Sequence, residues 1–171
     1  MSHNISDNGG NDGAGDQRNG DQRNASSSRD IAARVVNALE NDEGMRPYGI
    51  KAEAYGQKVR LWGIVDVLAE KQRAEQIALS VPGVEEVVND LTISTDGRIT
   101  DSGTAFEAME ELALEPGVDL KRVGARSEGG TVILEGRVED QEEKDAAMRA
   151  ASKSRGARNV VSRLKVEKAD K

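Results

Sequence analysis

The chain repeats itself: residues 30–93 align with residues 103–166 without a gap, at a constant offset of 73 residues. Gly63 falls on Gly136 and Gly83 on Gly156. The other identical pairs are mostly apolar and include Leu39/Leu112, Val59/Val132, Leu61/Leu134, Val65/Val138, Ala74/Ala147, Val88/Val161 and Leu91/Leu164. Apolar residues and glycines define a core and its turns. The repeat therefore predicts two copies of one domain of about 65 residues, near the lower limit for independent folding.

Composition excludes several classes of function. Without cysteine there can be no disulfide, thiolate metal site or cysteine nucleophile, and the only histidine, His3, lies in a polar segment. Because no nucleophile–base pair or cofactor loop is recognisable, we expect no enzyme, no cofactor and no metal ion. No apolar run approaches the roughly 18 residues of a membrane span, and a secretory signal is not evident. We therefore expect a cytoplasmic protein, or a periplasmic one only if a leader has been removed.

The repeat also divides the chain into parts. Residues 1–29 are almost all Gly, Asn, Asp, Ser, Gln and Arg, and cannot bury enough apolar surface to offset the entropy of ordering. We expect a disordered arm there, with an interaction tail or spacer as the alternative. The remaining parts are a first domain at 30–94, a linker at 95–102, a second domain at 103–167 and a C-terminal tail at 168–171.

Hydrophobic periodicity predicts the same element order in each unit. A helix capped by Ser28 or Asp30 comes first and ends near Gly44. The first unit then has strands over 50–55 and 59–65, a helix over 68–80 and a strand over 87–93. The second has a helix through Phe106, Met109 and Leu112, strands over 123–126 and 131–138, a helix over 142–152 and a strand over 160–166. The fold class is α+β, with two tandem α-β-β-α-β units.

Each strand-helix-strand step predicts a right-handed crossover between parallel strands. Each unit should therefore be a small mixed three-stranded sheet with two helices on one face. The order of the strands in the sheet is not readable from the sequence.

The pattern resembles the BON domain family, small bacterial domains found in osmotic-shock and nodulation-related proteins. The resemblance is carried by Val59–Val65 (VRLWGIV), Val132–Val138 (VILEGRV) and Pro82–Leu91 (PGVEEVVNDL). In the second copy the last motif becomes Arg155–Leu164 and loses the proline and the Asn-Asp pair. The resemblance implies a non-enzymatic, often tandem domain that associates with phospholipid membranes or envelope components. It transfers no catalytic residues.

Two conspicuous features are given structural interpretations. Gly63 and Gly136 are not followed by a helix, so we expect them to relieve crowding at a close approach to the sheet, and do not expect a phosphate site. The acidic cluster Glu139, Asp140, Glu142, Glu143 and Asp145 lacks the pattern of a calcium loop. We interpret it as the first turn of a helix, where negative charge is favourable.

One predicted strand face combines apolar and basic residues. Tyr55, Trp62 and Ile64 are expected opposite the core, interleaved with Lys51, Lys58 and Arg60. Such a face suits a lipid interface or a protein partner, because Trp and Tyr favour half-wet surfaces and cations attract anionic headgroups. The alternative, which the sequence favours, is that the face packs against the other repeat. Ile133 has the equivalent face position in that repeat.

A second candidate is a run of cations near the C-terminus. It contains Arg149, Lys153, Arg155, Arg158, Arg163 and Lys165, in a chain whose net charge is −7. An anionic membrane could bind there, although a solvated helix end and edge strand is the usual explanation. We do not expect nucleic acid as a partner, because aromatic-basic RNA motifs are absent from the sequence.

We therefore predict a non-catalytic binding or scaffolding module. It would associate with anionic phospholipid or an envelope-linked partner through Tyr55, Lys58, Arg60, Trp62, Ile64 and the basic run. The alternative is a homo-oligomeric structural protein whose sheet faces or edges pair between chains.

Overall fold

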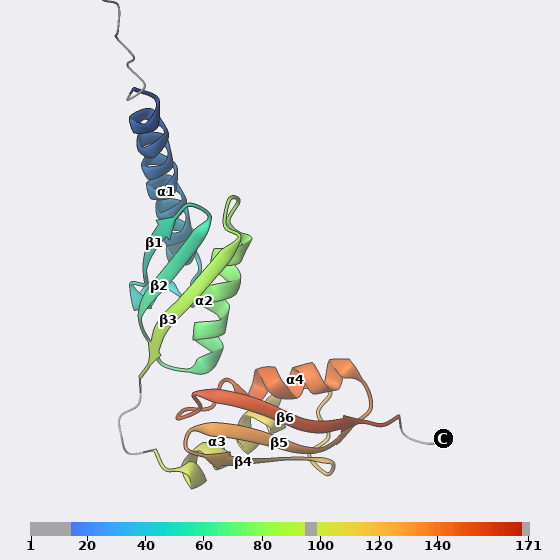
Figure 1. Cartoon of the computed structure of the whole chain (residues 1–171). Helices are drawn as coiled ribbons and strands as arrows, with labels where there is room; N and C mark the ends of the chain where they lie inside the picture. Colours follow the sequence, from blue (N-terminus) through green and yellow to red (C-terminus); the bar gives the residue numbers. More distant parts are fainter. Residues whose placement is uncertain (1–14, 95–98, 169–171) are drawn as a thin grey trace, which may run out of the picture.

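The computed structural model describes residues 15–94 and 99–168, and side chains from residue 27 onward (Figure 1). Two α-β-β-α-β units follow one another along the chain. The elements of the first domain are α1 (Gly15–Asn41), a 3-10 turn (Arg46–Tyr48), β1 (Lys51–Tyr55), β2 (Lys58–Val65), α2 (Leu68–Ser80) and β3 (Glu86–Ile93). Those of the second are α3 (Asp101–Leu114), β4 (Val123–Glu128), β5 (Thr131–Val138), α4 (Gln141–Ala151) and β6 (Asn159–Val166). The predicted element order and α+β class are confirmed.

The sheet of the first domain, sheet A, has the order β1-β2-β3. β1 and β2 form an antiparallel hairpin whose turn contains Gly56, at a φ of +62° that favours glycine. β2 and β3 are parallel, and α2 provides the crossover between them. The second domain repeats this topology as sheet B, with the order β4-β5-β6. The central strand of each sheet therefore has an antiparallel neighbour on one side and a parallel neighbour on the other.

The core of each domain lies between the sheet and its two helices. In the first domain Val59, Leu61 and Val65 of β2 are fully buried and pack with residues of α1 and α2. Their equivalents in β5, Val132, Leu134 and Val138, are fully buried in a separate core. Alternation along β2 explains this burial, since every second side chain faces the helices. Among the described residues, the opposite face of each sheet carries no helix of its own domain (Figure 1).

The start of the first helix differs from the prediction. α1 begins at Gly15, so residues 15–29, expected as part of a polar arm, are helical, and residues 1–14 lie outside the described residues. No proline interrupts 15–29, and extending a helix already anchored by a packed segment costs less than nucleating one. α3 likewise begins at Asp101, inside the expected linker. The exact domain boundaries stay a prediction.

Ser28 is consequently not an N-cap, but it has another role. Its Oγ accepts a hydrogen bond of 3.0 Å from the N–H of Gly56 in the β1–β2 turn. The equivalent residue, Asp101, accepts bonds from the N–H groups of Gly129 and Gly130 in the β4–β5 turn, at 2.9 and 3.1 Å. In both domains a side chain of the first helix thus holds the hairpin turn in place.

Candidate functional site: the outer face of sheet A

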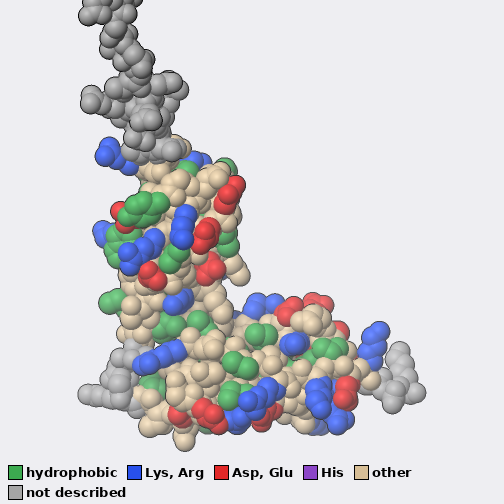
Figure 2. All heavy atoms as spheres, viewed as in Figure 1, with side chains coloured by type: hydrophobic (Ala, Val, Ile, Leu, Met, Phe, Trp, Pro, Cys, Tyr) green, Lys and Arg blue, Asp and Glu red, His purple; other side chains and the backbone are tan. Residues whose placement is uncertain are grey.

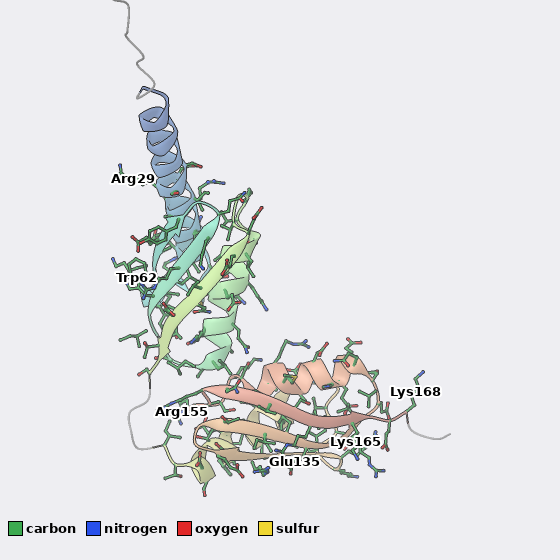
Figure 3. The ribbon with its side chains drawn as sticks, in the orientation of Figure 1. Arg29, Trp62, Glu135, Arg155, Lys165 and Lys168 are labelled. Atoms are coloured by element: carbon green, nitrogen blue, oxygen red, sulfur yellow. The ribbon has the colours of Figure 1, made fainter. Side chains whose placement is uncertain are left out.

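β2 places a row of side chains on the face of sheet A that no helix of the first domain covers. Its burial alternates, so that Lys58, Arg60, Trp62 and Ile64 are exposed while the residues between them face the core or are partly covered. Tyr55, at the end of β1, is exposed beside them and is opposite Lys58 in the hairpin register. Figure 3 shows Trp62 projecting away from the sheet. We call Tyr55, Lys58, Arg60, Trp62 and Ile64 the outer-face cluster.

Packing of this face against the second repeat, the interpretation favoured from the sequence, is wrong. Tyr55, Trp62 and Ile64 are 64%, 39% and 62% exposed. Ile133, the expected counterpart, lies within sheet B, flanked in register by Arg126 and Val161. The domains meet elsewhere, where α2 begins and α4 ends. The aromatic residues of sheet A are therefore left accessible.

The outer face is balanced in charge, whereas the sequence predicted a basic surface. The Nζ of Lys58 lies 3.2 Å from Glu86, and the Nε of Arg60 lies 2.6 Å from Asp90. Both acids belong to β3, whose position in the sheet could not be predicted from the sequence. These pairs are exposed, so each contributes little to stability, about 0–1 kcal/mol. Their main effect is to reduce the attraction of the face for anions.

Tyr55 adds a neutral hydroxyl to the outer-face cluster. A hydrogen bond to the Glu53 carboxylate, with smaller contributions from desolvation and the charge of Glu53, raises the pKa of Tyr55 above its ordinary value of 10.0. The phenol therefore stays protonated at physiological pH. Together with Trp62 it offers apolar ring surface and a polar edge, a combination suited to an interface between water and an apolar phase.

The basic run does not form a single patch. Arg163 and Lys165 alternate with the core-facing Leu164 of β6, and so lie on the outer face of sheet B. Arg149 belongs to α4, which covers the opposite face of that sheet. Figure 3 shows Arg155 and Lys165 at opposite ends of the second domain.

Several of these cations also have acidic partners. Arg155 lies 2.6 Å from Glu107, Arg163 lies 3.7 Å from Glu135 and Lys153 lies 4.0 Å from Glu115. Arg158 is exposed, and its backbone N–H, not its guanidinium group, donates to the carbonyl of Gly130 at 2.7 Å. Figure 2 likewise shows acidic and basic side chains interspersed on the visible face. The basic run is therefore weaker than the outer-face cluster as a candidate binding surface.

Two apolar residues of α3 are exposed, which the sequence analysis did not predict. Phe106, one of the apolar residues from which the helix was predicted, is 64% exposed, and Leu114 is 77% exposed. The buried side of α3 is formed instead by Thr104, Ala108 and Leu112, at four-residue spacing. This spacing was visible in the sequence, but a polar threonine and a small alanine gave a weaker apolar signal than phenylalanine.

The acidic cluster at the start of α4 has a structural role. Asp140 is the N-cap and accepts from the N–H of Glu143 at 2.8 Å. Glu143 accepts from the N–H groups of Glu139 and Asp119 at 2.7 and 3.2 Å. Across the part of the chain that the structure describes, no group of three or more potential ligands is arranged to hold a metal ion.

Comparison with known proteins agrees with this architecture. The family model described as "BON domain" matches residues 27–95 and 100–168. The chain is 33% identical over 133 residues to "Outer membrane lipoprotein DolP" of Haemophilus influenzae, covering 75% of this chain and 68% of that protein. It is 27% identical over 143 residues to "Osmotically-inducible protein Y" of Escherichia coli, covering 80% of this chain and 71% of that protein.

A solved structure of CdsD, a structural protein of the type III secretion system of Chlamydia trachomatis, is also similar. Its TM-score is 0.35 at 12% identity, and the match covers 83% of this chain and 64% of that one.

The relatives correct one expectation. The sequence predicted a cytoplasmic protein, and the similarity to a protein named as an outer membrane lipoprotein contradicts that prediction. Among the described residues, no helix has the length and apolar character needed to cross a membrane. Neither curated name describes an enzyme. The two α-β-β-α-β units, the internal repeat and the two matched segments lead to one conclusion: this chain belongs to the BON domain family and carries two BON domains in tandem.

Proposed function

We propose that this protein is a non-catalytic binding module that associates with an anionic phospholipid surface of the cell envelope through the outer-face cluster. The observation that carries the proposal is the exposure of Tyr55, Trp62 and Ile64 on one uncovered sheet face. Large apolar side chains rarely gather on a water-facing surface without a partner. The similarity to an outer membrane lipoprotein and an osmotically inducible protein supports an envelope-related or stress-related role.

The geometry also suggests how such an association would work. Trp62 and Ile64 would enter the headgroup region, while Lys58 and Arg60 would remain at its edge. Because Glu86 and Asp90 already pair with these cations, the electrostatic share of the binding energy should be small. We therefore expect weak, reversible association with a modest dependence on salt.

Fluorescence of Trp62, the only tryptophan, tests this proposal. Titration with vesicles of phosphatidylglycerol and phosphatidylcholine should shift the emission to shorter wavelength, and cosedimentation should recover the protein with the vesicles. Ile64→Ser should weaken both effects, whereas Leu79→Ser, at a 45% exposed position on α2, should not. Unchanged emission and no cosedimentation with anionic vesicles would contradict the proposal, and would favour an envelope-linked protein as the partner.

Self-association is the second candidate. The order of each sheet leaves β1 and β3, and β4 and β6, as edge strands, and one side of each makes no strand pairing within the described parts of the chain. Such edges can pair between copies. Sedimentation velocity over a hundredfold concentration range decides this candidate, because a constant monomer mass would exclude it.

A further inference from the structure

The helix α2 is capped by the other domain. The N–H of Ala69, in its first turn, donates a 2.9 Å hydrogen bond to the carbonyl oxygen of Ser152, at the end of α4. The first N–H groups of a helix and its last carbonyls have no partners within the helix. This single bond therefore satisfies one unpaired group on each helix. It also brings the positive end of one helix dipole to the negative end of another.

The two repeats differ at the position where this contact is made. At the offset of 73 residues, the N-cap of α2 is Val67, which makes no side-chain cap bond, whereas the N-cap of α4 is Asp140, which does. The third helical residue keeps its role in both copies. Glu70 accepts from the N–H of Asp66 at 2.9 Å, and Glu143 accepts from the N–H of the equivalent residue, Glu139, at 2.7 Å. The two helix starts therefore differ in the capping side chain. It is absent from α2, the helix whose first turn donates a hydrogen bond to the other domain.

Burial shows the same asymmetry. Leu68, the first residue of α2, is 7% exposed but is not part of the first domain's core cluster. Its equivalent, Gln141, is exposed. Ser152 is 2% exposed, and its own N–H and Oγ are satisfied within α4, by Met148 and Arg149. A helix start that is exposed to water is expected to carry a polar residue, as at Gln141. A helix start that is covered by another domain can carry an apolar residue such as Leu68.

We propose that the start of α2, Val67–Ala69, is a docking surface for the end of α4 in the same chain, and that it holds the two BON domains in one fixed orientation. The occupant is the segment around Ser152, identified by the hydrogen bond and by the complementary helix ends. A small cavity of about 230 Å³ beside the contact is lined from both helices, including Gln72 and Gln76 of α2 and Lys153 after α4. The docking leaves the outer-face cluster uncovered.

Hydrogen exchange of the full chain tests the bond without any substitution. The Ala69 N–H should exchange at least tenfold more slowly than the Glu142 N–H, its equivalent in α4, which has no hydrogen-bond partner among the described residues. Both amides lie in the first turn of a helix, so the comparison is matched for position. Equal exchange rates would overturn the proposal.

Domain orientation provides the second test. The chain has no cysteine, so spin labels can be attached through Glu43→Cys and Lys121→Cys, at exposed positions of the two domains. We expect a single narrow distance distribution. The double substitution V67D/L68Q gives α2 a polar start like that of α4, and should at least double the width of the distribution. Leu68→Ala is the milder alternative if that variant does not fold. A distribution already broad in the intact chain, or one equally narrow in folded variants, would refute the docking.

Asp140→Ala is the matched control. It removes the cap of α4 at the far end of that helix from Ser152, so the interdomain distance should not change. A broadening as large as that of V67D/L68Q would show that general loosening of a helix, and not the docking surface, sets the domain orientation.

Discussion

The carbonyl oxygen of Arg122 occupies the space that a side chain at position 136 would need. Gly136 has a φ of +124°, and a Cβ built there would overlap this oxygen and lie 3.2 Å from the Cα of Val123. The glycine at the equivalent position 63 has a φ of +143°, but a Cβ there would lie 3.6 Å from its nearest neighbours, Ile50 and Leu91. The crowding predicted from the sequence is therefore confirmed at Gly136. At Gly63 a Cβ would make ordinary contacts, and only the positive φ favours glycine.

Gly136→Ala should consequently destabilise its domain more than Gly63→Ala. Both substitutions place a side chain at a strongly positive φ, which costs about 1–3 kcal/mol. At position 136 the overlap with backbone adds to this cost, and we expect a total above about 3 kcal/mol. Urea denaturation followed by circular dichroism measures both losses. Equal losses would mean that β4 moves away from β5 without penalty.

The carboxylate of Asp101 should make the second domain sensitive to acid. Hydrogen bonds from the N–H groups of Gly129 and Gly130 and from the Ser127 hydroxyl lower the pKa of Asp101 below its ordinary value of 3.8. Since the folded pKa is the lower one, the stabilisation is present above pH 3.8 and is lost as the pH falls through the folded value. Asp101→Asn should lower the urea midpoint at pH 7 and have less effect at pH 3.

Glu110→Gln, at an exposed position of the same helix, is the control for Asp101→Asn. It should leave the midpoint nearly unchanged at both pH values. An effect of Asp101→Asn that is the same at pH 3 and pH 7 would show that the charge of this carboxylate is unimportant.

Tyr48 should make the first domain sensitive to alkali. Its hydroxyl donates to Glu70 at 2.6 Å, and the Asp66 carboxylate is a second acceptor for the same hydrogen at 3.1 Å. Burial and these hydrogen bonds raise the pKa of Tyr48 well above 10.0. The neutral phenol is thus favoured in the folded state, and the stabilisation is lost as the pH rises above about 10. The variant Tyr55→Phe has Tyr48 as its only tyrosine. In an absorbance titration of this variant, Tyr48 should ionise at a pH well above that of an unfolded control.

Asp140→Ala should cost the second domain about 1 kcal/mol, the usual value of an N-cap side chain. The bond lost is the one from the N–H of Glu143, at 2.8 Å. Asp140→Ser retains a capping oxygen and should recover most of the loss. If alanine and serine are equally destabilising in thermal denaturation, the cap contributes nothing.

The order of helices and strands could be predicted from the sequence because hydrophobic periodicity is a local property, and the repeat gave the same order twice. Val59, Leu61 and Val65 occupy alternate positions on one face of the strand, and the structure buries all three. The strand order depends on pairing between distant segments, and no local pattern states it. For this reason Glu86 and Asp90 were not expected beside Lys58 and Arg60, and the outer face was predicted to be basic.

The site was predictable as a set of exposed residues but not as a surface. Trp62 and Tyr55 could be placed on one face by alternation alone. Whether the other domain covers that face depends on where the two domains meet. They meet at Ala69 and Ser152, which are 83 positions apart in the chain. A clue existed in the sequence, since Val67 and Leu68 replace the polar residues found at the start of the second copy. It became interpretable only once the end of α4 was seen beside them.

The contact of α2 with α4 runs head to tail, from the start of a helix in one copy to the end of its equivalent in the next. Repeated head-to-tail contacts would build an open array of domains. The free helix ends of this pair differ from the ends that meet in the contact. Asp140 caps the start of α4 through the N–H of Glu143, and the end of α2 carries an exposed Leu79 at the position of the buried Ser152. The two copies are therefore distinct first and second members of the pair and are not interchangeable.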